Sequence, residues 1–192
     1  MLSTRLASNL VTCRFELDKP LGEGAWWFGD AQSAKASALA AAVFGVETVS
    51  GVKINGAVLS VTRDSYDDWP AVTRRVAAIL EDHAASGKPA VAPGTPANLP
   101  TTEEIRAKAA HILETEINPA VASHGGEIVL VDVKDATIFV RLTGGCQGCA
   151  SSTATLKQGV ERSFREAIPQ LDEIRDVTDH DAGENPYYAQ GH

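Results

Sequence analysis

The chain is poor in cysteine, in basic residues and in long apolar runs, and each shortage narrows the class of protein. Three cysteines among 192 residues are an odd number and too few for a disulfide scaffold, which indicates a reducing compartment. A net charge of −8 provides no broad basic surface, so we expect no nucleic-acid partner. The longest uninterrupted apolar run, Ala38–Phe44, is far too short to cross a bilayer, so we expect no membrane partner.

The N-terminal segment has no apolar core of the kind found in a secretory signal peptide. Its sequence, MLSTRLASNLVTCRFELD, runs directly into an alternating pattern that predicts a strand. Together with the shortage of cysteine, this predicts a cytoplasmic protein of bacterial type. An organelle matrix is the other reducing compartment that the sequence allows.

A proline-rich stretch divides the chain. Residues Gly87–Pro100, GKPAVAPGTPANLP, contain four prolines, two glycines and no aromatic residue. Proline fixes φ and removes a backbone donor, so we expect an extended, semi-rigid linker over 87–100. The predicted organisation is therefore an N-terminal domain over 1–86, a C-terminal domain over 101–180 and a polar tail over 181–192.

The N-terminal part predicts a small α+β domain. Val11–Asp18 alternates as a strand, and Asp30–Val46 has an aspartate cap followed by an Ala/Leu-rich helical pattern. Thr48–Asp64 consists of two β-branched runs joined by Asn55-Gly56, which predicts a hairpin with a type I′ turn. An amphipathic helix then follows from Asp67 to Gly87.

The C-terminal part predicts the order α-β-β-α-β, which makes the whole chain two small α+β domains. Thr101 and Glu104 form a capping box, and the helical pattern after them ends at Asn118-Pro119. The runs GEIVLVDV and ATIFVRL predict a second hairpin. The segment SSTATLKQGVERSFREAI predicts a helix, and LDEIRDVTD predicts a last strand.

The segment TGGCQGCASS holds two of the three cysteines, Cys146 and Cys149, in a C-x-x-C motif. It lies between the predicted strand that ends at Leu142 and the helix predicted to begin near Ser151. Free backbone N–H groups and the helix dipole stabilise anions at a helix N-terminus, so we expect both thiols to have lowered pKa values. Glycines around the motif leave the backbone amides uncovered by side chains.

Four kinds of site share this local pattern. A structural zinc site needs four ligands, but the chain has no second C-x-x-C and no paired histidines. A thioredoxin-like thiol–disulfide oxidoreductase also has C-x-x-C at a helix start, usually with an aromatic residue before it and a proline within it. Packed thiols or an incidental disulfide are disfavoured by the glycine-rich loop. An iron–sulfur cluster needs four thiolates, so two chains around a two-fold axis would each supply two.

The segment Ile117–His180 resembles the C-terminal domain of NifU, which is shared by the Nfu iron–sulfur carriers. The matching pieces are the HGG at His124–Gly126, the G-x-C-x-G-C core, TLKQGVE at Thr155–Glu161 and the closing DVTDH. The ending GENPYY also looks like that of bacterial Nfu proteins. The N-terminal part is similar, more loosely, to the N-terminal domain of Nfu proteins through SGVKINGAVLSVTRD and DWPAV.

The resemblance implies a carrier without turnover chemistry of its own. It implies a 4Fe–4S cluster held between two copies of the chain, with Cys146 and Cys149 at the family's ligand positions, and transfer of that cluster to apo client enzymes. Upstream scaffold proteins would supply the cluster, because the chain lacks the 2Fe–2S and scaffold domains of full-length NifU.

Five other residues have ordinary structural interpretations. Cys13 matches no family ligand and is expected to be a buried apolar residue. His124 is expected to help end the first helix of the C-terminal domain, with a role as proton handler or ligand near the cluster as the alternative. Arg162 is expected to lie on a solvated helix face, with neutralisation of cluster charge or steering of partners as the alternative. Trp26 and Trp27 are expected in the core, with an exposed client-binding patch as the alternative.

Overall fold

The computed structural model describes residues 2–7, 11–65, 68–122, 125–144 and 153–178. It divides into two compact units, Met1–Leu99 and Pro100–His192, each with its own hydrophobic core. Both units combine helices with a sheet, which confirms the predicted mixed helix-and-sheet class.

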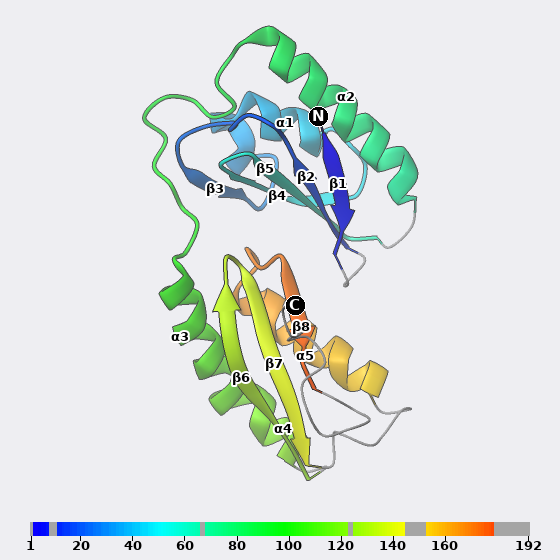
Figure 1. The fold of residues 1–192 in the computed structure, drawn as a ribbon, viewed down its shortest axis with the longest axis vertical. Helices are drawn as coiled ribbons and strands as arrows, with labels where there is room; N and C mark the ends of the chain where they lie inside the picture. Colours follow the sequence, from blue (N-terminus) through cyan, green and yellow to red (C-terminus); the bar gives the residue numbers. More distant parts are fainter. Residues whose placement is uncertain (1, 8–10, 66–67, 123–124, 145–152, 179–192) are drawn as a thin grey trace, which may run out of the picture. The chain divides into compact units, whose positions relative to one another are not determined.

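Unit 1 is built on a five-stranded antiparallel sheet in the order β1-β2-β5-β4-β3 (Figure 1). The apolar residues of the central strands alternate, so that one face of the sheet packs against the helices and forms the core. The strands are β1 (Ser3–Leu6), β2 (Thr12–Glu16), β3 (Ala25–Phe28), β4 (Val49–Asn55) and β5 (Val58–Arg63); the helices are η1 (Ser33–Ala36), α1 (Ala38–Phe44) and α2 (Trp69–Ser86).

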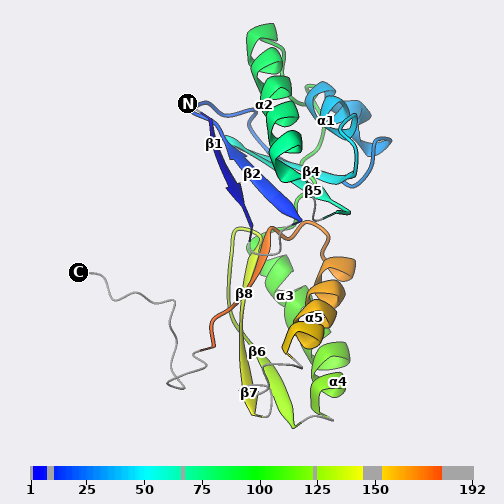
Figure 2. The same cartoon turned by 90° about the vertical axis from the view of Figure 1, so that its right-hand side faces the viewer.

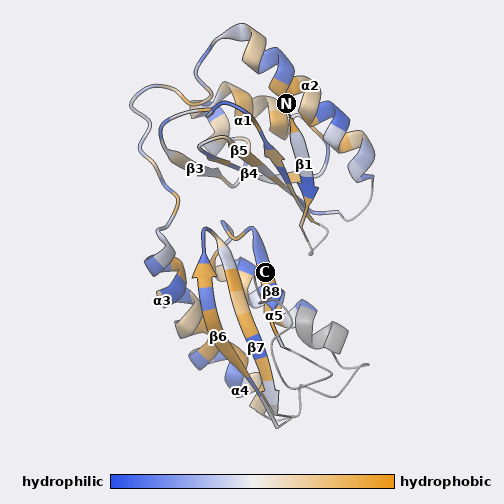
Figure 3. Ribbon diagram, in the orientation of Figure 1, coloured by the Kyte–Doolittle hydropathy of each residue, from blue (hydrophilic) through white to orange (hydrophobic). Residues whose placement is uncertain are grey.

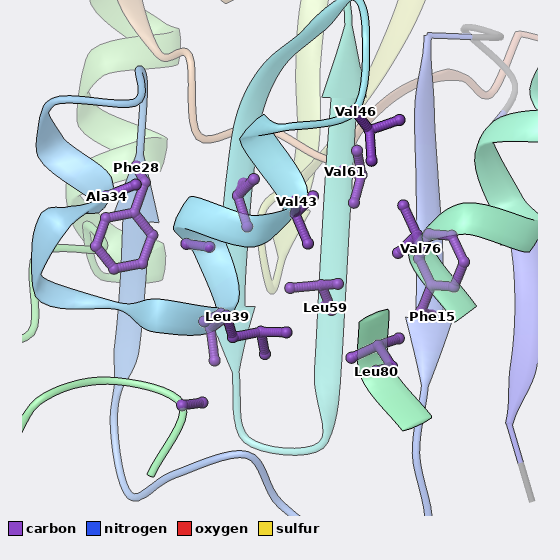
Figure 4. Packing of buried hydrophobic residues seen from close by; sticks show 14 of the residues in the cluster. Phe15, Phe28, Ala34, Leu39, Val43, Val46, Leu59, Val61, Val76 and Leu80 are labelled. Carbon is purple, nitrogen blue, oxygen red and sulfur yellow. The ribbon is translucent and has the colours of Figure 1, made fainter. Parts of the chain in front are cut away.

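Side chains from both helices meet the sheet in this core (Figure 4). Leu39 and Val43 of α1 and Val76 of α2 pack with Phe15 and Leu59 of the sheet, and none of them is more than 2% exposed. Complete burial of side chains of this size contributes about 1.5–3 kcal/mol each. The predicted amphipathic helix that ends at Gly87 is confirmed, since α2 ends at Ser86 and Gly87 has the left-handed φ typical of a helix C-terminus.

Two sequence expectations for unit 1 were wrong. The single helix predicted over Asp30–Val46 is split into η1 and α1, because Ser37 is extended and its Oγ accepts a hydrogen bond from the Ala40 N–H at 2.9 Å. The hairpin turn is not type I′ at Asn55-Gly56, because Asn55 pairs with Val58 and only Gly56 has a positive φ. A type I′ turn needs positive φ at both central residues.

Unit 2 has a three-stranded sheet in the order β6-β7-β8, with its helices on one face (Figure 2). β6 and β7 form an antiparallel hairpin, whereas β8 runs parallel to β7 after the α5 crossover. Figure 3 shows that the strands β6 and β7 are largely apolar. The elements are α3 (Thr102–Ile112), η2 (Leu113–Ile117), α4 (Asn118–Ala122), β6 (Gly126–Lys134), β7 (Thr137–Gly144), α5 (Thr153–Ala167) and β8 (Glu173–Asp176).

The first helix of unit 2 starts as predicted but does not stop at Asn118-Pro119. The capping box is confirmed, because the Thr101 Oγ1 accepts from the Glu104 N–H and the Glu104 carboxylate accepts from the Thr101 N–H at 2.7 Å. The helical path then continues through η2, a π-helical turn, into α4. The wider π turn places the irregular backbone directly before Pro119, whose ring and missing N–H are incompatible with a regular α-helix interior.

The proline-rich segment differs from the extended linker expected over 87–100. Ala90 and Val91 are 1% and 7% exposed and belong to the core of unit 1. The boundary between the two units lies at Leu99–Pro100. Two small apolar side chains among prolines are enough to hold the segment against unit 1, and composition alone gave no sign of this packing.

Trp27 lies flat against Gly51 on the sheet of unit 1. A Cβ atom added at Gly51 would overlap the six-membered ring of Trp27, whereas a Cβ added at Gly159 of α5 would meet open space. The absence of a side chain at Gly51 therefore leaves the space on β4 that the Trp27 ring occupies.

We predict that Gly51→Ala lowers the free energy of unfolding by about 1–3 kcal/mol, because the added methyl group displaces the Trp27 ring. Chemical denaturation followed by tryptophan fluorescence measures the change. The control is Gly159→Ala, which should raise the stability by about 0.5–1 kcal/mol. An unchanged stability for Gly51→Ala would contradict the described packing of Trp27.

Candidate functional site

The two motif cysteines, Cys146 and Cys149, lie outside the described residues. The structure describes the elements on either side of them, β7 up to Gly144 and α5 from Thr153. The motif therefore connects the carboxyl end of a strand to the start of a 15-residue helix. α5 begins four residues after Cys149, slightly later than the sequence predicted.

The parallel pairing of β7 with β8 defines the edge of the sheet that adjoins the motif. Thr137 pairs with Glu173 and Val140 with Asp176, so the carboxyl ends of both strands lie at the same edge. In sheets with parallel strands, ligands bind characteristically outside the carboxyl ends. The antiparallel partner β6 enters the sheet at this edge, because Gly126 pairs with Gly144.

Two side chains hold the end of β7 and its neighbour β6 in place. The Leu142 N–H donates to the Thr178 Oγ1 at 2.7 Å, which continues the β7–β8 ladder beyond the last strand pair. On the other side, Asn118 binds both backbone groups of Ile128, accepting from its N–H at 2.9 Å and donating to its carbonyl at 3.1 Å. Since Ile128 and Leu142 are cross-strand partners, the two strands that lead to the motif are fixed on both outer sides.

Sequence reasoning missed these two positioning residues. The sequence predicts a helix end at Asn118 because this residue precedes Pro119. Its role as a partner of β6 depends on the continuation of the chain into α4. Thr178 lies near the end of LDEIRDVTD, the predicted last strand, and in the closing DVTDH that matches the family. Thr178 is 36 positions from Leu142 in the sequence, so no local sequence pattern predicts this hydrogen bond.

The helix that follows the motif is anchored by burial and by one arginine. Phe164 and Ile168 are fully buried between α5 and the sheet. Arg165 forms an ion pair with Glu161 at 2.8 Å and donates to the carbonyl of Leu171 at 3.1 Å. Arg162 instead pairs with Glu166 on the solvent side, as expected for a solvated helix-face charge. The positive end of the α5 dipole therefore has a fixed place directly after the cysteine segment.

Cys13, the third cysteine, is a core residue of unit 1. It is the second residue of β2 and is 2% exposed, which confirms the prediction from sequence that it is buried. Burial raises the pKa of its thiol from an ordinary value of 9.0 to about 11, and this effect outweighs the hydrogen bond with the Arg5 backbone. A thiol in this state is a poor nucleophile and a poor metal ligand near neutral pH.

The predictions for His124, Trp26 and Trp27 can be compared with the structure only in part. His124 lies outside the described residues, while the neighbouring Gly125 has φ +70° and donates its N–H to the Ala122 carbonyl at the end of α4. Trp26 is buried in the core, as predicted. Trp27 is half-buried.

The described part of the chain contains neither a cluster of metal-binding side chains nor a helix that could span a membrane. There, no group of three or more His, Cys, Asp or Glu side chains is arranged to hold a metal ion. The described helices also include none that is both long and apolar enough to pass through a membrane.

Two family models match the chain, one in each unit. Residues 2–87 match the model described as the N-terminal domain of the scaffold protein Nfu/NifU. Residues 110–175 match the NifU-like domain, a range that includes β6, β7, the cysteine motif and α5.

Curated relatives of the chain include bacterial proteins named Fe/S biogenesis protein NfuA. The protein from Ectopseudomonas mendocina is 54% identical over 79 residues, which cover 41% of this chain and 41% of the relative. The protein from Pseudomonas aeruginosa is 53% identical over 90 residues, 46% of this chain and 44% of the relative. The matched segments thus span less than half the length of these relatives.

The chain also resembles solved structures. The solution structure of a NifU-like protein from Saccharomyces cerevisiae covers 48% of this chain and 85% of its own, with a TM-score of 0.43 and 17% identity.

We predict that Thr178→Val increases hydrogen exchange at the Leu142 amide about tenfold, since a buried N–H loses its acceptor. The free energy of unfolding should fall by about 1–3 kcal/mol. Exchange measured by NMR tests this, with Thr178→Ser as the control that keeps the hydroxyl. Equal exchange at Leu142 in both variants would contradict the described end of β7.

For Cys13 we predict alkylation by iodoacetamide at pH 8 that is slower by on the order of a hundredfold in the folded chain than in denaturant. The neutral buried thiol stabilises the fold below pH 9.0, and this contribution is lost as the pH rises through about 11, where labelling should accelerate. Peptide mass spectrometry resolves Cys13 from the other two cysteines. Labelling at the same rate in the folded and denatured chains would overturn the assignment.

Proposed function

Because the chain belongs to the Nfu family, with an Nfu N-terminal domain followed by a NifU-like domain, we propose that it is an iron–sulfur cluster carrier rather than an enzyme. The single observation that carries the proposal is the match of the NifU-like domain across the C-x-x-C motif. The names of the NfuA relatives support the same role in Fe/S biogenesis.

Cys146 and Cys149 are the proposed cluster ligands, and the cluster is proposed to be 4Fe–4S. An iron–sulfur cluster of this kind takes four thiolates, and one chain offers two at this motif. The third cysteine is unsuitable because burial in β2 keeps its thiol protonated near neutral pH. The other two ligands therefore come from a second copy of the chain, and the cluster bridges a symmetric homodimer.

The elements around the motif suit the chemistry of thiolate ligands. The start of α5 supplies free N–H groups and a positive dipole end close after Cys149, which favour anionic sulfur. The motif glycines leave room for a bulky inorganic group. The strand ends on the other side are fixed by Asn118 and Thr178, so the loop starts from a defined position.

The proposed partners follow from this role. The chain receives a cluster from an upstream scaffold protein and passes it to apo client enzymes in the cytoplasm. A cluster shared between two chains at a separable interface is more easily released than one enclosed by a single chain, which suits a carrier. We assign cluster binding to 101–180 and a client-selecting role to 1–86.

We predict that anaerobic reconstitution with iron and sulfide gives about four irons per two chains, and that Cys146→Ala or Cys149→Ala abolishes cluster binding. Both variants should stay folded, because neither changes any of the buried residues that form the described core of unit 2. Iron assay combined with sizing of the product measures both effects.

The matched control for these variants is Cys13→Ala, which should retain the full iron content although it loses core packing. Loss of iron in Cys13→Ala with unchanged binding in the motif variants would overturn the ligand assignment. Reduction of insulin disulfides by the purified chain, with no iron bound after reconstitution, would instead identify a thiol–disulfide oxidoreductase.

A further inference from the structure

Residues 90–99 form a strap that runs along unit 1 before the chain enters unit 2. Its first part is buried. The Ala90 carbonyl accepts from the Ser37 hydroxyl at 2.6 Å, and the Ala92 N–H donates to the Ala36 carbonyl at 2.7 Å. With Ala90 and Val91 in the core, this inner part is a fixed anchor beside the start of α1.

The outer part of the strap covers the free edge of β3. β3 is the last strand of the sheet, with β4 as its strand partner. Asn98 accepts from the Trp27 N–H at 2.6 Å and donates to the Trp27 carbonyl at 2.9 Å, while its own N–H donates to the Ala25 carbonyl at 3.1 Å. One asparagine therefore acts as the missing neighbour strand and satisfies three outward-facing backbone groups.

A further contact ties the strap to the tryptophan pair. The Trp26 indole N–H donates to the Thr95 carbonyl at 3.2 Å. Beyond this bond, the outer part is held by polar contacts at exposed positions, with Pro96, Ala97 and Asn98 all exposed. No side chain after Val91 belongs to the core of unit 1.

The two parts of the strap are therefore held with very different strength. Burial of apolar side chains secures the inner anchor. In the outer part, the net gain of each exposed hydrogen bond is similar in size to the cost of ordering one residue. The prolines reduce that cost, because they restrict the released chain as well. The outer part therefore lacks the stabilisation that buried apolar side chains give the inner anchor, which allows it to dock and release reversibly.

We propose that the outer part of the strap, residues 93–99, is releasable and sets the length of the tether between the two units. When it is docked, unit 1 extends to Leu99 and no free linker remains before Pro100. When it is released, the anchor at Ala92 holds and seven residues become free. At about 3.1 Å per residue in an extended proline-rich conformation, the tether lengthens by roughly 20 Å.

Release has a second consequence at the sheet. It uncovers the N–H and carbonyl of Trp27 together with the Ala25 carbonyl, so the β3 edge is closed in the docked state and open in the released state. The length of the tether and the exposure of the β3 edge therefore change together, because Asn98 is released in both cases.

The test compares wild-type full-length chain with Asn98→Ala in two measurements. Hydrogen exchange read by NMR should show a protected Trp27 amide in the wild type and about tenfold faster exchange in the variant, because the amide loses its acceptor. Small-angle X-ray scattering on the fraction of equal oligomeric state should show a larger maximum dimension for the variant. The matched control is Ala97→Ser at the adjacent exposed position, which should change neither measurement.

The amides of Val52 and Leu59 in the core of unit 1 show whether the variant remains folded. Faster exchange at Trp27 with unchanged core amides and a larger dimension supports the strap. Equal exchange at Trp27 in wild type and Asn98→Ala would show that the segment does not dock. Faster exchange without a change in dimension would refute its control of the tether. None of these outcomes depends on cluster binding.

Discussion

The parallel pairing of β7 with β8 is the constraint on which the candidate site depends. Antiparallel neighbours can be joined by a tight turn, but a parallel neighbour requires the chain to cross back, and here α5 makes that crossover. The segment between β7 and α5 must then leave the carboxyl end of a strand and enter the amino end of a helix. The cysteines are in that segment, so in the sequence they lie between the end of β7 and the start of α5, where the helix dipole has its positive end.

One chain has only two cysteines that are suited to bind a cluster, so a four-thiolate site requires two chains. Two cysteines are in the motif, and the third is enclosed in the sheet of unit 1 with a raised pKa. The core of unit 1 therefore keeps the Cys13 thiol protonated near neutral pH, while the cysteine pair of unit 2 directly precedes α5 in the sequence. Because a four-thiolate cluster cannot be completed by one such pair, the proposed function requires a second chain.

Local sequence signals predicted much of the fold. The Thr101–Glu104 capping box and the helix before Gly87 follow from chemistry within a few residues, and both are present. Contacts between distant residues were not predictable. Asn98 completes the β3 edge from 71 positions away, and Thr178 extends the ladder of β7 from 36 positions away. For the site, sequence identified the motif and its flanking strand and helix, but not the side chains that fix the strand ends.

Native mass spectrometry of the anaerobically reconstituted wild-type chain shows whether two chains share one cluster, as we propose. We expect a homodimer that carries a single cluster of about four irons and four sulfides, and a return to apo chains without iron when the dimer dissociates. A monomer that retains a complete cluster, or a dimer that carries one zinc ion instead, would contradict it.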